Sequence, residues 1–137
     1  MDDLYRDFIL DHYRNPRNAG TLEAPDASFE DTNPLCGDKI RMDLKLRDGV
    51  VEDVRFRGRG CAISQASASL LTEAIKGKSI GEINRLGKDD VLANLGISIS
   101  AARLKCALLG LKVLKEALAL RYEPAAEEQA YPDGRAS

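Results

Sequence analysis

The sequence has no tryptophan, only 5% aromatic residues and a single histidine, His12, among its 137 residues. Any core must therefore be built from Leu, Ile, Val and Ala, which the 44% hydrophobic content allows. One histidine excludes a catalytic metal site made of several histidines and argues against a Cys–His hydrolase. His12 falls on the apolar side of a predicted helix, so we expect it to be mainly structural.

An excess of positive charge and a long apolar run are also missing. Twenty basic and 22 acidic residues give a net charge of −2, whereas nucleic-acid-binding proteins normally carry a basic excess. No apolar run approaches the roughly 20 residues needed to span a bilayer. Residues 1–5, which include two aspartates, resemble neither a secretory signal nor a transit peptide. We therefore expect a cytoplasmic protein whose main partner is neither nucleic acid nor membrane.

The spacing of apolar residues predicts one helix followed by a small sheet. Apolar positions three and four residues apart predict a helix over 2–14. Strict alternation of apolar and charged residues predicts strands over 40–47 and 50–57, joined by an Asp48-Gly49 hairpin turn. Residues 27–32 form a weaker candidate for a first strand. The three strands would make an antiparallel meander.

Helical spacing dominates the sequence after Cys61. It predicts a helix from Cys61 to about residue 76, a short helix opened by a Ser79–Glu82 capping box, another over 88–95, and a long one over about 100–121. Strands followed by helices indicate an α+β fold, with helices packed on one face of a three-stranded antiparallel sheet. We expect a single domain over residues 1–123 and a mobile polar C-terminal tail over 124–137.

Three cysteines in a reducing compartment do not suggest a disulfide framework, so we consider metal ligands, reactive thiols and core residues. Cys36 lies between Pro34 and Gly37, which would hold its thiol on a stiff, exposed turn. Asp38 follows two residues later, close enough for its carboxylate to join the same metal ion. The alternative is an ordinary turn in which Asp38 only makes side-chain-to-backbone hydrogen bonds.

The other two cysteines are associated with predicted helices. Cys61 stands at a strand–helix junction, where free amides and the helix dipole favour a thiolate, and Gly58 and Gly60 leave room for a large group to approach the backbone. Cys106 follows Lys105 near the start of the long helix. Each could instead be a buried structural residue, and for Cys106 that reading is the stronger one.

Considered together, Cys36, Asp38, Cys61 and Cys106 offer a Cys₃Asp set of four donors. Zinc accepts sulfur and oxygen donors in tetrahedral geometry, and soft thiolates also suit iron–sulfur clusters. The separations of 25 and 45 residues between successive cysteines are not those of a zinc finger. Spacing alone therefore does not specify a metal site.

Four stretches carry a more specific signal: Asp11-His12-Tyr13-Arg14-Asn15-Pro16-Arg17-Asn18, Asn33-Pro34-Leu35-Cys36-Gly37-Asp38, Gly58-Arg59-Gly60-Cys61-Ala62-Ile63-Ser64 and Arg103-Leu104-Lys105-Cys106. Together they resemble the U-type iron–sulfur cluster assembly proteins, that is, the IscU/SufU family and the N-terminal domain of NifU. The resemblance covers the chain from the first predicted helix to about residue 121.

The resemblance implies an α+β sandwich with Cys36, Asp38, Cys61 and Cys106 clustered at one end. Such a protein receives sulfur from a cysteine desulfurase, assembles a transient [2Fe–2S] cluster from iron, and passes it to apo iron–sulfur proteins. Isolated members often hold zinc at the same ligands. Among the cysteines we expect Cys36 to accept the sulfur first, with Cys106 as the alternative.

Two departures from the IscU pattern bear on the subtype. Lys105 stands where IscU-type scaffolds carry His, and residues 98–103 lack the Leu-Pro-Pro-Val-Lys motif that a specialised DnaK-type chaperone grips, which argues against docking of that chaperone. Both departures look SufU-like, yet the segment between Cys61 and Cys106 is too short for the usual SufU insertion. We favour a non-enzymatic scaffold; a zinc-dependent sulfurtransferase and a structural zinc module stay open, with a thiol enzyme as a remote third class.

Overall fold

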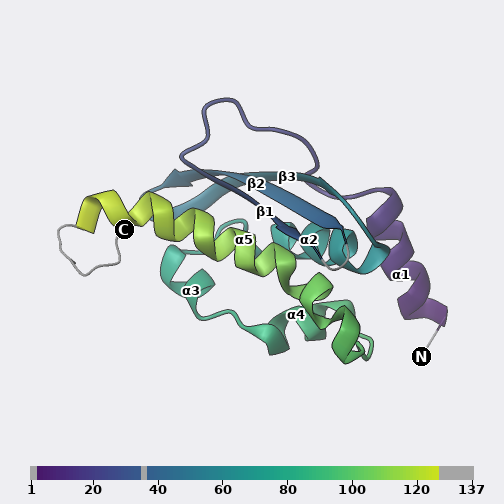
Figure 1. Ribbon diagram of the computed structural model, residues 1–137. Coiled ribbons are helices and arrows are strands. Elements are labelled where there is room, and N and C mark those ends of the chain that lie inside the picture. Colours follow the sequence, from purple (N-terminus) through teal and green to yellow (C-terminus); the bar gives the residue numbers. More distant parts are fainter. Residues whose placement is uncertain (1–2, 35–36, 127–137) are drawn as a thin grey trace.

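The computed structural model describes residues 3–34 and 37–126 (Figure 1). Cys36 and residues 127–137 of the expected tail lie outside this part of the chain. The elements are α1 (Asp3–Arg14), β1 (Ala27–Asn33), β2 (Asp38–Arg47), β3 (Val50–Arg59), α2 (Ala62–Ile75), α3 (Ile80–Asn84), α4 (Lys88–Leu95) and α5 (Ala101–Ala126). The predicted α+β fold is confirmed. Only α5 differs noticeably from its expected bounds, because it continues past Pro124 where the sequence suggested an end near residue 121.

The three strands form one antiparallel sheet in the order β1-β2-β3. Asp48 and Gly49 both have positive φ angles, 54° and 77°, as expected for the two-residue turn between β2 and β3. The inward side chains of β2, Ile40, Met42 and Leu44, are completely buried. They face α2 and α5, which lie on one side of the sheet in Figure 1. The sheet thus has one apolar face and one charged face.

Helix α2 packs against both α1 and α5 because it presents small side chains. Ala66, Ser67, Ala68 and Ser69 are all buried, and the Ser67 hydroxyl donates a hydrogen bond of 2.7 Å to the backbone carbonyl of Ala107 in α5. A buried hydroxyl that makes such a bond avoids the cost of desolvation without a partner. The small side chains of residues 66–69 therefore allow α2 to pack closely against α1 and α5.

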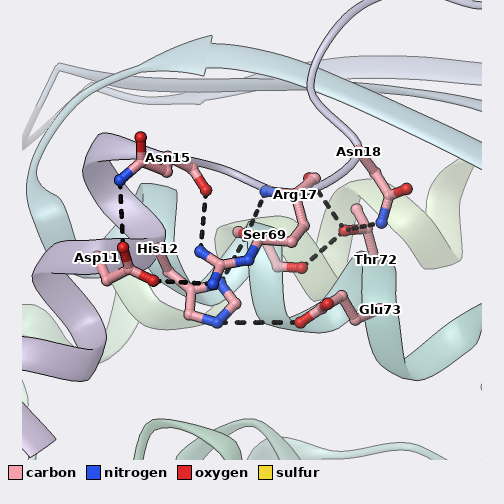
Figure 2. Close-up of polar contacts among 8 residues, drawn as sticks. All are labelled: Asp11, His12, Asn15, Arg17, Asn18, Ser69, Thr72 and Glu73. Atoms are coloured by element: carbon pink, nitrogen blue, oxygen red, sulfur yellow. Dashed lines mark hydrogen bonds and ion pairs between the residues drawn. The ribbon is translucent and has the colours of Figure 1, made fainter.

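The stretch Asp11–Asn18 fastens α1 and the following loop to α2 (Figure 2). His12 is 2% exposed, as expected for a structural histidine, and its Nδ1 lies 2.8 Å from Ser69 Oγ. The backbone N–H of Arg17 donates to the same hydroxyl oxygen at 2.9 Å. The other ring nitrogen, Nε2, lies 3.9 Å from a carboxylate oxygen of Glu73, so both nitrogens of the buried ring have partners on α2.

The loop after this stretch covers the outer edge of β3. The Phe56 N–H donates to the Asn18 carbonyl, and the Gly20 N–H donates to the Phe56 carbonyl, both at 2.9 Å. Exposed strand edges invite pairing with other chains, and a covering loop prevents it. Residues 11–20 thus connect α1, α2 and the edge of the sheet.

Among the described residues, no helix is both long and apolar enough to cross a membrane.

Candidate metal centre

Three elements that are distant in sequence bring metal-binding side chains together at one end of the sheet. Asp38 is the first residue of β2, Cys61 immediately precedes α2, and Cys106 lies in the second turn of α5. One ligand atom from each, a carboxylate oxygen and two Sγ atoms, all lie within 4.8 Å of one another. The structure therefore assembles three of the four predicted ligands; the fourth, Cys36, lies outside the described residues.

Asp38 is a fully buried carboxylate that is held by the backbone of Cys61, another candidate ligand. Its Oδ1 accepts a hydrogen bond of 2.9 Å from the N–H of Cys61, and its Oδ2 lies 4.0 Å from Cys61 Sγ. A buried carboxylate requires such compensation, because an unpaired one would be strongly destabilising. The two oxygens have different surroundings: Oδ1 fixes the orientation of the group, and Oδ2 faces the thiol.

Gly60 makes this arrangement possible. Its φ of +141° lies in the region that residues with a Cβ rarely adopt, and a Cβ built there would overlap the carboxylate of Asp38. The sequence predicted that the glycines beside Cys61 let a large group approach the backbone. For Gly60 that group is the side chain of Asp38 itself.

Cys61 is the N-cap of α2, which confirms its predicted place at the strand–helix junction. Its φ and ψ of −72° and 163° are extended, and its Sγ accepts a hydrogen bond from the Ser64 N–H at 3.5 Å. The Ser64 hydroxyl donates back to the Cys61 carbonyl at 3.1 Å. These two hydrogen bonds hold the Cys61 sulfur at the N-terminus of α2.

Cys106 is 1% exposed, so its side chain combines packing in α5 with membership of the site. The side-chain amide of Asn33 donates towards its Sγ at 3.9 Å, a long and weak contact. Asn33 is the residue paired with Asp38 across β1 and β2. Sequence reasoning did not assign this asparagine a role, although its place in the Asn33–Asp38 motif was the available signal.

The chain on both sides of Cys36 belongs to this end of the molecule. The Gly37 N–H donates to the Asn33 carbonyl at 2.8 Å, and Gly37 has a φ of +74°. Beside this turn lies a pocket of about 390 Å³ between the end of β1 and α5. Its lining residues are Thr32, Asn33, Pro34, Lys105, Leu108, Leu109 and Lys112. Lys105, the residue that distinguishes this chain from the IscU pattern, thus borders an open surface next to the site.

The donors fit the metal that the sequence suggests. Around tetrahedral zinc, with bonds of about 2.0–2.3 Å, neighbouring ligand atoms lie roughly 3.3–3.8 Å apart. The described ligand atoms lie within 4.8 Å of one another, so modest side-chain rotations suffice to bind one ion. Two sulfurs and one oxygen also match the preference of zinc and of cluster iron. Asp38, Cys61 and Cys106 are therefore a possible metal site.

Comparison with known proteins agrees with this architecture. Residues 4–128 match the family model described as NifU-like N terminal domain. The chain is 43% identical to the zinc-dependent sulfurtransferase SufU of Bacillus subtilis, over 87% of this chain and 92% of that protein. It is 34% identical to the iron–sulfur cluster assembly scaffold protein IscU of Escherichia coli, over 84% of this chain and 91% of that protein.

Solved structures show the same fold. A putative iron–sulfur cluster assembly scaffold protein for the SUF system from Fervidobacterium islandicum superimposes with a TM-score of 0.72 at 28% identity, covering 82% of this chain and 94% of that one. The N-terminal part of a NifU-like protein from Brucella abortus gives 0.74 at 27% identity, covering 91% and 98%. The fold is that of U-type iron–sulfur assembly proteins. This chain belongs to that family, the NifU N-terminal domain family with its IscU and SufU members.

Proposed function

We propose that the protein accepts sulfur from a cysteine desulfurase and acts as a scaffold that assembles and transfers a transient [2Fe–2S] cluster, with Cys36, Asp38, Cys61 and Cys106 as the ligands of the cluster. The observation that supports this most directly is the convergence of Asp38, Cys61 and Cys106 within 4.8 Å at the end of the sheet. Cysteine thiolates brought together from separate elements can bind the iron of a cluster. A scaffold of this kind needs no general acid or base.

Sulfur would enter by exchange between a persulfide and a thiolate. A cysteine thiolate of this chain attacks the terminal sulfur of the desulfurase persulfide; a new S–S bond forms, the old one breaks, and the desulfurase cysteine leaves as a thiolate. Of the two cysteines described, Cys106 is buried and Cys61 is tied into a helix cap. These constraints support Cys36 as the acceptor.

Resident zinc fits the same residues. Zinc bound by the three cysteines and Asp38 would keep the thiols deprotonated and gathered at one point. Because Asp38 Oδ1 is occupied by the Cys61 N–H, Oδ2 is the oxygen we assign to the metal. A single carboxylate oxygen is a weaker donor than a fourth thiolate, which suits a site that must release the cluster it assembles.

The similarity to the Bacillus subtilis SufU protein favours a second candidate, a zinc-dependent sulfurtransferase that carries persulfide sulfur without building a cluster. Lys105 agrees with this candidate, since IscU-type scaffolds carry His at the corresponding place. The two functions share the sulfur-accepting step and differ in the fate of the sulfur afterwards.

One experiment separates these candidates. The protein is incubated anaerobically with a cysteine desulfurase, cysteine and ferrous iron, and cluster absorbance, bound persulfide and zinc content are measured together. Appearance of a protein-bound cluster that an apo-ferredoxin then removes supports the scaffold. Persulfide with retained zinc and no cluster supports the sulfurtransferase. If neither persulfide nor cluster forms, both proposed functions are overturned. A structural zinc module is then the remaining interpretation.

A further inference from the structure

The outer face of the sheet carries four basic side chains near the metal centre. The register places Lys39 opposite Arg59, and Arg41 opposite Arg57, on β2 and β3. Side chains alternate between the two faces of a strand, so these four point away from the helices that cover Ile40. We refer to Lys39, Arg41, Arg57 and Arg59 as the cationic sheet patch.

This arrangement is costly for the sheet alone, because like charges directly opposite each other on adjacent strands repel. Two carboxylates compensate in part. Asp43 lies 3.2 Å from Arg41 and 3.3 Å from Arg57. Glu30 lies 3.4 Å from Lys39. Asp43 is 1% exposed, so one buried carboxylate serves two guanidinium groups.

Hydrogen bonds keep Asp43 charged. Burial raises the pKa of its carboxyl, but hydrogen bonds from the Ser28 hydroxyl, the Leu22 N–H and Arg57 outweigh burial and hold the pKa below its ordinary value. The partial neutralisation of Arg41 and Arg57 is therefore permanent at neutral pH. The uncompensated charge of the patch lies at the end nearest the metal centre.

That end is Arg59. Its side chain is exposed, and no carboxylate in the described part of the chain lies within ion-pair distance of it. With its four cations and two compensating carboxylates, the patch has a positive formal charge, whereas the whole chain has a net charge of −2. The rest of the molecule is therefore negative, and the patch stands out as a positive region on an acidic protein.

The patch adjoins the metal centre through the covalent chain. Lys39 directly follows Asp38 on β2, and Arg59 lies two residues before Cys61 at the end of β3. Asp38 and Lys39 are successive residues of β2 and therefore face opposite sides of the sheet, and Cys61 follows the end of β3 as the N-cap of α2. A macromolecule seated on the patch would reach the rim of the site.

We propose that the cationic sheet patch docks an acidic surface of the cysteine desulfurase that delivers sulfur to the metal centre; this rests on the proposed function. A positive region on an otherwise negative protein orients an acidic partner during its approach and raises the association rate. The other common polyanion, nucleic acid, is a poor match. Duplex binders make about six to ten phosphate contacts, and the patch offers four cations, three of which are already paired.

The test reverses one charge at the patch and one elsewhere on the same sheet. Arg59→Glu changes the cation that has no ion pair among the described residues. Arg47→Glu is the matched control, because Arg47 lies at the opposite end of β2 with its side chain 75% exposed. Association of each variant with a purified cysteine desulfurase is measured by biolayer interferometry at low and at high NaCl concentration. Thermal melting and zinc content verify that folding and the metal centre are unchanged, and Arg59→Gln serves if the reversal impairs folding.

We expect Arg59→Glu to lower the association rate about tenfold at low salt and by less than about threefold at high salt, with Arg47→Glu within about twofold of the wild type. Equal rates for all three proteins would overturn the docking assignment, as would a defect that persists in high salt. Tighter binding of the wild type to a short DNA duplex than to the desulfurase would also overturn it. If the wild type accepts persulfide while the rates are equal, only the docking surface is wrong; if it accepts none, the proposed function fails and the docking assignment with it.

Discussion

The backbone N–H of Cys61 donates a hydrogen bond of 2.9 Å to Asp38 Oδ1, so one candidate metal ligand orients the carboxylate of another. This side-chain-to-backbone bond spans 23 residues and is not the local turn bond that the sequence allowed as an alternative to metal binding. The same carboxylate presents Oδ2 to Cys61 Sγ, at 4.0 Å. The bond to the Cys61 N–H and the proposed metal binding are compatible, because they use different oxygens.

Replacing Asp38 separates these two contributions. Asp38→Asn can keep the bond to the Cys61 N–H through its amide oxygen but is a poor metal ligand, so we expect the dissociation constant for zinc to rise at least about tenfold. Asp38→Ala should lose both contributions, and a cluster bound to it should be transferred more slowly and persist longer. Competition with a chromophoric chelator measures zinc affinity. Wild-type zinc affinity and transfer rate in Asp38→Asn would show that the carboxylate is not a ligand.

Gly60→Ala should damage the metal centre without touching a ligand. The new Cβ would overlap Asp38 and adopt an unfavourable φ, for which we expect a loss of unfolding free energy of about 1–3 kcal/mol and a reduced zinc content. Gly77→Ala is the control, since Gly77 also has a positive φ, 85°, but has open space around it. Urea titration and metal analysis give both quantities. Equal zinc loss in the two variants would mean that backbone strain, not displacement of Asp38, is responsible.

Removing the metal should leave the protein folded. The core contains fully buried Ile40, Met42, Leu44, Leu114 and Leu118, and burying each such side chain contributes about 1.5–3 kcal/mol without involving the site. After chelation we expect native far-UV circular dichroism and a cooperative thermal transition at a lower midpoint. Faster hydrogen exchange should be confined to the start of α2 and the first turns of α5. Complete unfolding on chelation would show that the core is not self-sufficient.

His12 should make stability depend on pH. Burial, followed by the nearby positive charge of Arg17, lowers the pKa of His12 below its ordinary 6.5, while Glu73 and Asp11 partly oppose the shift. The unfolded chain then binds the proton more readily than the native one. The contribution of His12 to the free energy of unfolding is therefore constant above about pH 6.5 and falls as the pH drops towards the folded-state pKa. Urea unfolding of the metal-free protein between about pH 7.5 and pH 5 measures this, with His12→Gln as the variant that lacks this contribution. Identical pH profiles for the two proteins would contradict the assignment.

Persulfide mapping tests the order of sulfur transfer. After a short reaction with desulfurase and cysteine, mass spectrometry should find the first persulfide on Cys36, because Cys106 is buried and Cys61 caps a helix. Cys36→Ser should abolish early label, whereas Cys106→Ser should leave it. Label on Cys61 alone would refute this order.

Local patterns were enough to predict most of the fold. Alternating apolar residues predicted β2 and β3, and the Asp48-Gly49 pair predicted the turn between them. The predicted Ser79–Glu82 capping box is present with both of its hydrogen bonds. These features depend on neighbours in sequence. The end of α5 was misplaced because helix ends depend on weak local preferences that the surrounding structure overrides.

The sequence by itself determined which residues could bind metal, since only three thiols and one adjacent carboxylate occur in suitable contexts. It also determined that Cys61 would lie at the junction between β3 and α2. The family resemblance already implied that Asp38, Cys61 and Cys106 meet, but only the tertiary structure decided that Gly60 leaves its space to Asp38 and that Asn33 reaches Cys106. Those relationships join residues between 22 and 73 positions apart. No local pattern encodes them, because they arise from the packing of α2 and α5 on the sheet.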